Sequence, residues 1–247
     1  ALPILAITGY TGPHFQEEAY RAGATDLQFK PLDRDEFVSK VVELTGMGGG
    51  DVRTAVLAIG GLVGDVEMGC GGTLLKHASA EATVVVVPLC RDELDEAGVG
   101  LTAARAAAEV IGAKVIIDEE ALDDTHRRIN LLERIVKDLR PRFAYFPAMD
   151  DDHPARREAF RIAKATTATV PTLLGYQTAT SGPDFKPTRF EDVGRQLAYK
   201  KEALTVYDDV GARRLDLSPR MAEAYARYWG RLERFGEVEP FEILRGT

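Results

Sequence analysis

Short apolar runs recur along most of this chain, and nearly every one is followed by a longer segment with helical spacing. The apolar runs cover residues 54–60, 82–89, 113–118 and 143–148, and the helical segments cover 71–80, 101–112 and 125–140. Strands that alternate with helices in this way form parallel sheets with helices on both faces. The pattern predicts an α/β domain with a parallel, Rossmann-like sheet, whose ligand site lies beyond the carboxyl ends of the strands.

A smaller unit of the same kind lies at the amino end. Its pattern predicts strands at 4–7 and 26–29 and helices at 14–22 and 33–44, a β-α-β-α unit with parallel strands. The segment GMGGGD at 46–51 follows, and its four glycines favour a flexible tether. We therefore expect one domain at 1–45, a linker at 46–51 and a second domain at 52–247.

Composition narrows the possible partners and compartment. The formal net charge is −8, from 39 acidic and 31 basic residues, which disfavours binding to nucleic acid or to an anionic membrane. The longest apolar run is far shorter than the ~20 residues that span a bilayer. The two cysteines, Cys70 and Cys90, form no CxxC motif, which is typical of a reducing compartment. We expect a soluble cytoplasmic protein.

Residues 3–44 resemble the last third of a CheY-like response-regulator receiver domain, which has a flavodoxin-like fold. Thr8 ends the first strand where that family has its switch hydroxyl, AGATD leads into the second strand, and Lys30-Pro31 matches the Lys-Pro of the phosphorylation site. The resemblance implies a receiver switch at Thr8, Lys30 and Pro31, with a cis peptide before Pro31. The family's phospho-accepting Asp lies upstream of the matched part, so a sensor kinase is expected as a partner only of a full-length receiver. The alternative is a generic β-α-β-α extension of the second domain.

The second domain carries a longer and more specific motif, GLVGDVEMGCGGTLLKH at 61–77. It resembles the first motif of the LmbE-like family, also called PIG-L, of zinc-dependent N-acetylglucosamine-type deacetylases. Further similarity lies at 139–160, 185–204 and 239–245, so the resemblance runs through residues 53 to 245. The GCGG within the motif is expected to permit close packing of a helix on a strand, or else to bind an anion with its amides.

The resemblance also implies which residues of the family's site are missing. That family binds zinc with a His and an Asp of the first motif and a His of the second, and a further Asp acts as general base. Here Leu62 stands at the first metal ligand, Gly64 at the base, and Arg156 at the third ligand. Asp65 keeps its ligand position, and His153 keeps the position that stabilises the oxyanion.

We therefore expect no competent catalytic residue and no zinc. Instead we predict that Asp65 and Arg156 form an ion pair within roughly 6 Å. Asp65 and His153 stay candidates for contact with a sugar-like ligand. A second possibility is a relocated divalent cation at the acidic loop MDDDH, through the carboxylates of Asp150, Asp151 and Asp152.

Three functions follow from these resemblances. The leading interpretation is a response-regulator-type signalling protein whose output module is an inactive LmbE-like domain used for binding. The first alternative is an active zinc-dependent N-acetyl sugar deacetylase, or another amide hydrolase, gated by the receiver. The second alternative is a carbohydrate-binding module. Receivers commonly pair through their last strands and helices, so a homo-oligomer is expected.

Overall fold

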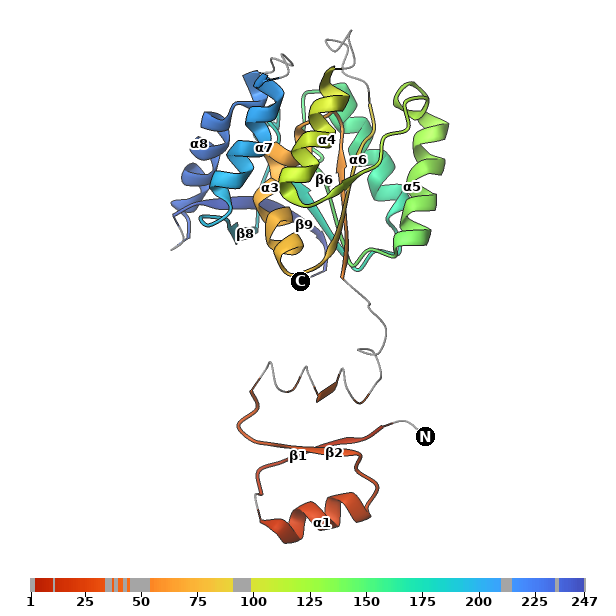
Figure 1. Cartoon of the computed structure of the whole chain (residues 1–247), viewed down its shortest axis with the longest axis vertical. Helices are drawn as coiled ribbons and strands as arrows, with labels where there is room; N and C mark the ends of the chain where they lie inside the picture. The colour runs from red at the N-terminus through yellow and green to blue at the C-terminus, as the bar shows by residue number, and fades with distance from the viewer. Residues whose placement is uncertain are drawn as a thin grey trace. The chain divides into compact units, whose positions relative to one another are not determined.

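The computed structural model describes residues 3–10, 12–33, 37, 40, 41, 44, 54–90, 99–209, 215–233 and 236–246. The chain divides into two compact units, Ala1–Arg53 and Thr54–Thr247 (Figure 1). The predicted linker at 46–51 and most of the predicted helix at 33–44 lie outside the described residues. Among the helices described, none has the length and apolar character needed to cross a membrane.

The described part of the first unit includes two short parallel strands and the helix that connects them. Strand β1 (Leu5–Thr8) pairs with β2 (Asp26–Phe29), and helix α1 (Pro13–Arg21) connects them. The predicted β-α-β part of this unit is therefore confirmed. The Lys30 amide donates to the carbonyl of Thr8 (N–O 2.8 Å), and the Lys30-Pro31 peptide is cis, so the residues of the predicted switch lie at one end of the strand pair.

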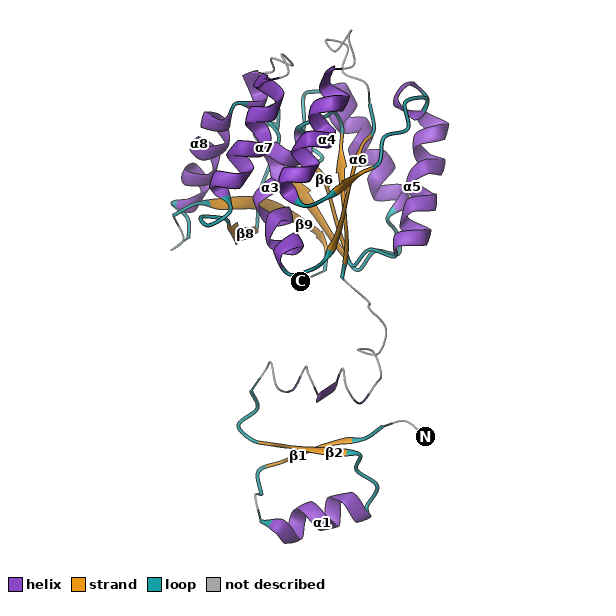
Figure 2. Ribbon diagram, viewed as in Figure 1, coloured by secondary structure: helices purple, strands orange, loops and turns teal. Residues whose placement is uncertain are grey.

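The second unit is built on a seven-stranded sheet with the order β5-β4-β3-β6-β7-β9-β8 (Figure 2). The pairs from β5 to β7 are parallel, as predicted, whereas β9 is antiparallel to both β7 and β8. The sheet is thus mostly parallel, with an antiparallel edge that the alternation of elements did not predict. The strands are β3 (Ala55–Gly60), β4 (Thr83–Pro88), β5 (Lys114–Val115), β6 (Phe143–Pro147), β7 (Thr172–Tyr176), β8 (Arg189–Asp192) and β9 (Val238–Arg245).

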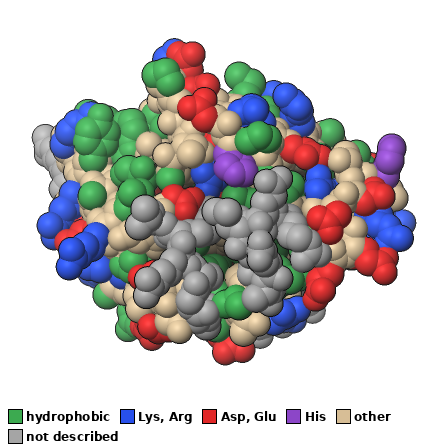
Figure 3. Space-filling model, turned by 90° about the horizontal axis from the view of Figure 1, so that it is seen from above, with side chains coloured by type: hydrophobic (Ala, Val, Ile, Leu, Met, Phe, Trp, Pro, Cys, Tyr) green, Lys and Arg blue, Asp and Glu red, His purple; other side chains and the backbone are tan. Residues whose placement is uncertain are grey.

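The parallel strands bring their connecting loops together at one edge, which we call the carboxyl edge. It comprises the turn 61–64 after β3, residues 89–90 after β4, residues 148–153 after β6 and residues 177–185 after β7. Figure 3 looks down on this side of the unit, where a histidine lies near the middle among acidic, basic and hydrophobic side chains. This is the edge at which open α/β sheets bind their ligands.

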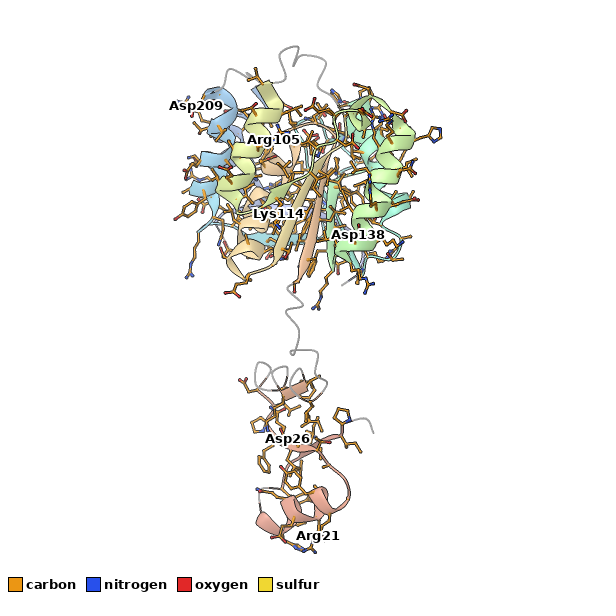
Figure 4. All side chains as sticks on the ribbon, turned by 45° about the vertical axis from the view of Figure 1, so that its right-hand side comes forward. Arg21, Asp26, Arg105, Lys114, Asp138 and Asp209 are labelled. Atoms are coloured by element: carbon orange, nitrogen blue, oxygen red, sulfur yellow. The ribbon has the colours of Figure 1, made fainter. Side chains whose placement is uncertain are left out.

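Helices cover both faces of the sheet, as the sequence predicts. Val56 and Ala58 of β3 pack in the core beneath α3, α4, α7 and α8, whereas Leu57 and Ile59 face the core beneath α5 and α6. Exposed charged residues such as Arg105 on α4 and Asp138 on α5 lie on the outer surfaces (Figure 4). The helices are α3 (Asp65–Ser79), α4 (Val99–Ile111), α5 (Thr125–Leu139), α6 (Pro154–Thr166), α7 (Leu197–Asp209) and α8 (Pro219–Gly230).

Helix α3 is buried over its first three turns and begins at Asp65, before the predicted start at 71. A Cβ on Gly69 would overlap the ring of Tyr176, which favours the close-packing interpretation of the glycines. The amides of Gly72 and Thr73 donate to the carboxylate of Glu239 on β9, over 2.8 and 2.7 Å. These amides therefore bind the carboxylate of Glu239, a side chain of the same unit, rather than an external anion. Glu239 also forms an ion pair of 2.7 Å with Lys200, a buried lysine of α7.

Candidate functional site

The turn between β3 and α3 holds one buried carboxylate. Gly64 is the N-cap of α3 with a φ of +86°, a left-handed conformation that glycine adopts without strain. Asp65, the first residue of the helix, is 2% exposed, and its Oδ2 accepts a hydrogen bond from the Leu62 amide over 2.9 Å. The turn thus fixes the Asp65 carboxylate beneath the carboxyl edge.

Arg156 on α6 provides the cation for this carboxylate. Its Nε lies 3.1 Å from each oxygen of Asp65, and its Nη2 lies 2.7 Å from Oδ1. The guanidinium, like Asp65, is 2% exposed. A planar guanidinium that meets both oxygens of a carboxylate forms one of the stronger charge-assisted hydrogen bonds in proteins. The predicted ion pair is confirmed.

Two further side chains bind the same guanidinium. Arg156 Nη2 donates to Asp216 Oδ2 over 2.8 Å, and Nη1 donates to Thr180 Oγ1 over 2.6 Å. Burial opposes the charge of Arg156, but Asp65, Asp216 and Asp151 together hold the pKa of Arg156 above its ordinary value. Neither Asp216 nor Thr180 belongs to a motif, so the sequence carries no signal for their contact with Arg156.

Close packing of the backbone surrounds the ion pair. A Cβ added to Gly61 would lie 2.8 Å from the Cα of Arg156, so a larger residue here would push α6 away from the turn. A Cβ on Gly64 would overlap the side chain of Leu217. Gly64 stands at the position that the resemblance assigns to a general base, and it has no side chain. Leu217 occupies the space that a side chain there would need.

His153 and Asp151 organise the start of α6. His153 is the N-cap, and its Nδ1 accepts a hydrogen bond from the Ala155 amide over 3.2 Å. The His153 amide donates to Asp151 Oδ1 over 2.8 Å, and the same oxygen accepts from Thr180 Oγ1 over 2.6 Å. The other oxygen of Asp151 accepts from Thr178. Asp151 therefore fixes the shape of the acidic loop and links it to Thr180, which also binds Arg156.

The other two carboxylates of the acidic loop do not join Asp151. Asp150 Oδ2 accepts from the Asp184 amide over 2.8 Å, on the loop that follows β7. Asp152 is exposed. Among all the described residues, no three His, Cys, Asp or Glu side chains form a group that could hold a metal ion. The loop geometry thus gives no support to a relocated cation site.

The residues at the carboxyl edge do not fit a zinc ion at the family's position. Both oxygens of Asp65 accept hydrogen bonds from Arg156, and a guanidinium stays protonated in proteins. Leu62 has no atom that can bind a metal, and its side chain packs in the core under α5 and α6. A zinc site needs three such ligands and a free coordination position. The site instead contains a fixed positive charge supplied by the chain.

Comparisons with known proteins agree with this architecture. The chain is 25% identical over 181 residues to YaiS, an uncharacterised deacetylase of Escherichia coli (strain K12), covering 68% of this chain and 95% of that protein. The N,N'-diacetylchitobiose deacetylase of Pyrococcus horikoshii matches with a TM-score of 0.62 and 18% identity, covering 88% of this chain and 96% of its own. Residues 54–247 have the fold of the LmbE-like deacetylases.

The LmbE-like fold also occurs in an enzyme with a different name. GalB, the 4-carboxy-2-hydroxymuconate hydratase of Pseudomonas putida KT2440, matches with a TM-score of 0.64 and 16% identity, covering 78% of this chain and 97% of its own. No family model matches the chain. The fold therefore does not by itself determine the reaction.

The comparisons also correct the leading functional interpretation. They relate the chain to deacetylases and give no support for a fused receiver domain, although the β-α-β unit at the amino end is present. The prediction of a response-regulator signalling protein is therefore wrong. A match over residues 3–44 alone was too short to carry a function, because β-α-β-α units recur in many α/β folds.

Proposed function

We propose that residues 54–247 form a deacetylase-type domain that binds an N-acetylated amino sugar and carries out no zinc-dependent hydrolysis at the carboxyl edge. The proposal rests on the buried ion pair of Asp65 and Arg156. In this pair the guanidinium of Arg156 binds the carboxylate that a zinc ion would need as a ligand. The pair supplies a fixed positive charge but no activated water.

Two features of the turn argue against the family's hydrolytic step. Gly64 offers no carboxylate to activate water, and the loss of a general base alone typically lowers a rate by about 10²- to 10⁴-fold. Zinc could bind Asp65 only by displacing Arg156, which would leave a buried guanidinium without its main partner. Breaking a buried ion pair in this way is costly.

The class of ligand comes from the relatives. One of them is named for N,N'-diacetylchitobiose, a disaccharide of N-acetylated amino sugars. We extend this class to the present chain because the overall fold is shared and the loops at the carboxyl edge still form indentations in the surface. One of these, of about 350 Å³, lies beside Cys90, Arg128 and Pro154.

An active amide hydrolase with a relocated metal is the competing proposal. It would need a new cluster of ligands, and the nearest candidates are the acidic-loop residues Asp150 and Asp151. Their carboxylates accept hydrogen bonds from the Asp184 amide and the Thr180 hydroxyl respectively. These bonds already engage both carboxylates, and no group of three possible metal ligands forms among the described residues, so we favour binding without hydrolysis.

Thermal unfolding of the purified protein with N,N'-diacetylchitobiose tests the proposal. A ligand that binds only the folded state stabilises it by about 2.7 kcal/mol at a concentration of 100 times Kd. We expect a saturable rise in Tm, and no rise with the fully deacetylated disaccharide as control. Acetate release is measured in parallel, with and without added Zn²⁺. Release that depends on zinc would establish the competing proposal, and no rise in Tm would refute sugar binding.

A further inference from the structure

An aromatic pocket lies at the carboxyl edge, between the loop that follows β7 and helix α8. Its volume is about 560 Å³, within the range of about 300–1,000 Å³ that is usual for small-molecule sites. The wall contains four aromatic side chains and one amide side chain, and we call it the α8 pocket: Phe185, Tyr225, Tyr228, Trp229 and Gln177.

The central ring of the α8 pocket is held in a fixed orientation. The indole Nε1 of Trp229 donates to Gln177 Oε1 over 2.6 Å. The ring of Phe185 meets Trp229 nearly at right angles with centroids 5.9 Å apart, and the ring of Tyr228 does so at 5.1 Å. A side chain fixed on several sides loses little conformational entropy when a ligand binds.

Both apolar and polar surface is available in the α8 pocket. Tyr228 is 55% exposed and Trp229 is half-buried, so part of each ring is open to a ligand. The guanidinium of Arg231 lies 3.6 Å from the centroid of the Tyr228 ring and covers one face of it, which leaves the other face for a ligand. Gln177 uses its amide oxygen on Trp229, and within the described residues its amide nitrogen makes no hydrogen bond. Burial and the nearby Asp216 raise the pKa of the Tyr225 phenol, so the hydroxyl is a neutral donor at physiological pH. The pocket combines flat apolar faces with hydrogen-bonding groups.

The same pocket lies close to the buried ion pair. Asp216, which accepts from Arg156, also acts electrostatically on Tyr225. Gly182, at the rim of the pocket, donates its amide to the carbonyl of Asp150 in the acidic loop. The α8 pocket is therefore an open, ligand-sized part of the surface next to a centre that is itself closed.

We propose that the α8 pocket binds one ring of an N-acetylated amino sugar, with the C–H face of the sugar stacked on Tyr228 and its rim against Trp229, whose ring lies nearly at right angles to that of Tyr228. A pyranose ring has an apolar face and a rim of hydroxyl and amide groups, which matches a wall of aromatic faces with polar groups at its edge. Gln177 and Tyr225 then supply hydrogen bonds to the rim. This inference rests on the proposed function, because it locates the sugar that the function requires.

Tryptophan fluorescence tests the location directly, because Trp229 is the single tryptophan of the chain. We expect titration of the full-length protein with N,N'-diacetylchitobiose to change its emission in a saturable way. Tyr228→Ala is expected to raise Kd at least tenfold. The matched control is Tyr199→Ala on α7, since Tyr199 is 57% exposed and does not line the pocket. This control is expected to leave Kd unchanged.

The outcomes separate this inference from the proposed function. A sugar-dependent rise in Tm with no change in Trp229 emission, or with an unchanged Kd in Tyr228→Ala, would place the sugar elsewhere and overturn the α8 pocket alone. No rise in Tm and no change in emission would overturn both. Circular dichroism and the Tm without sugar check that Tyr228→Ala folds, as expected for an exposed side chain.

Discussion

Asp65 and Arg156 are both 2% exposed, and Arg156 also binds Asp216. Burying two charges costs several kcal/mol for each in lost hydration, and their attraction roughly offsets that cost. Such a pair contributes little net stability, whereas the loss of one partner leaves the other charge uncompensated. The chain should therefore respond differently to the loss of one partner and to the loss of both.

Arg156→Leu is expected to lower the free energy of unfolding by about 3–5 kcal/mol. The double variant Asp65→Leu with Arg156→Leu is expected to be more stable than the single variant, because Asp65 is then no longer a buried carboxylate without its cation, whereas the loss of Arg156 to Asp216 is common to both variants. Urea denaturation at pH 7 of both variants and of Asp65→Leu completes the cycle. Equal stability of Arg156→Leu and the unchanged protein, or additive losses in the double variant, would contradict the role of the pair.

The ion pair was predictable from the sequence, but its surroundings were not. Asp65 and Arg156 each lie within a segment that matches the family's motifs, so their proximity followed from the resemblance. Asp216 lies 60 residues from Arg156 along the chain, and Thr180 lies 24 residues away. Only the packing of η2 (Leu215–Leu217) and the loop after β7 brings them together, and neither segment has a spacing that indicates such a contact.

Among the elements, α3 differs most from its prediction. The glycines between Gly69 and Gly72 weaken the helical signal of this segment, because glycine is a weak helix former. The predicted helix therefore began too late, at residue 71. In the folded chain, contact with Tyr176 and the hydrogen bonds to Glu239 outweigh that intrinsic preference. Strand β5 is also shorter than the predicted strand at 113–118, since only Lys114–Val115 pairs with β4 at the edge of the sheet.

The far end of α3 carries a histidine that should make stability depend on pH. His77 Nε2 lies 2.8 Å from the hydroxyl of Tyr145 on β6, and burial lowers the pKa of His77. The unfolded chain therefore binds a proton at a pH where the folded chain does not. Stability is lost as the pH falls below the ordinary histidine pKa of about 6.5.

We expect the free energy of unfolding to be lower at pH 5.5 than at pH 7.5. His77→Gln is expected to reduce this difference, because glutamine can still hydrogen-bond to Tyr145 but takes up no proton. Urea denaturation of both proteins at the two pH values measures it. His126→Gln is the matched control, since His126 is exposed on α5. An identical pH dependence in His77→Gln and the unchanged protein would exclude His77 as the cause.

For the whole molecule, the alternation of strands and helices correctly predicted an α/β fold with a mostly parallel sheet. The antiparallel edge was not predictable, because β8 and β9 pair across the intervening helices α7 and α8 and carry no turn signal for a hairpin. The ion pair of Asp65 and Arg156 followed from motif positions, whereas the signalling function inferred from the first unit was wrong. Long motifs inside a shared fold therefore carried more information than a short unit common to many folds.

Metal analysis is the sharpest test of the proposal that a guanidinium takes the place of the zinc ion in this chain. The protein is purified without chelator, and its zinc content is measured before and after incubation with Zn²⁺ and removal of the excess. We expect far less than one zinc ion per chain in both samples, because Arg156 holds both oxygens of Asp65. One tightly bound zinc ion per chain, with release of acetate from N,N'-diacetylchitobiose, would contradict it.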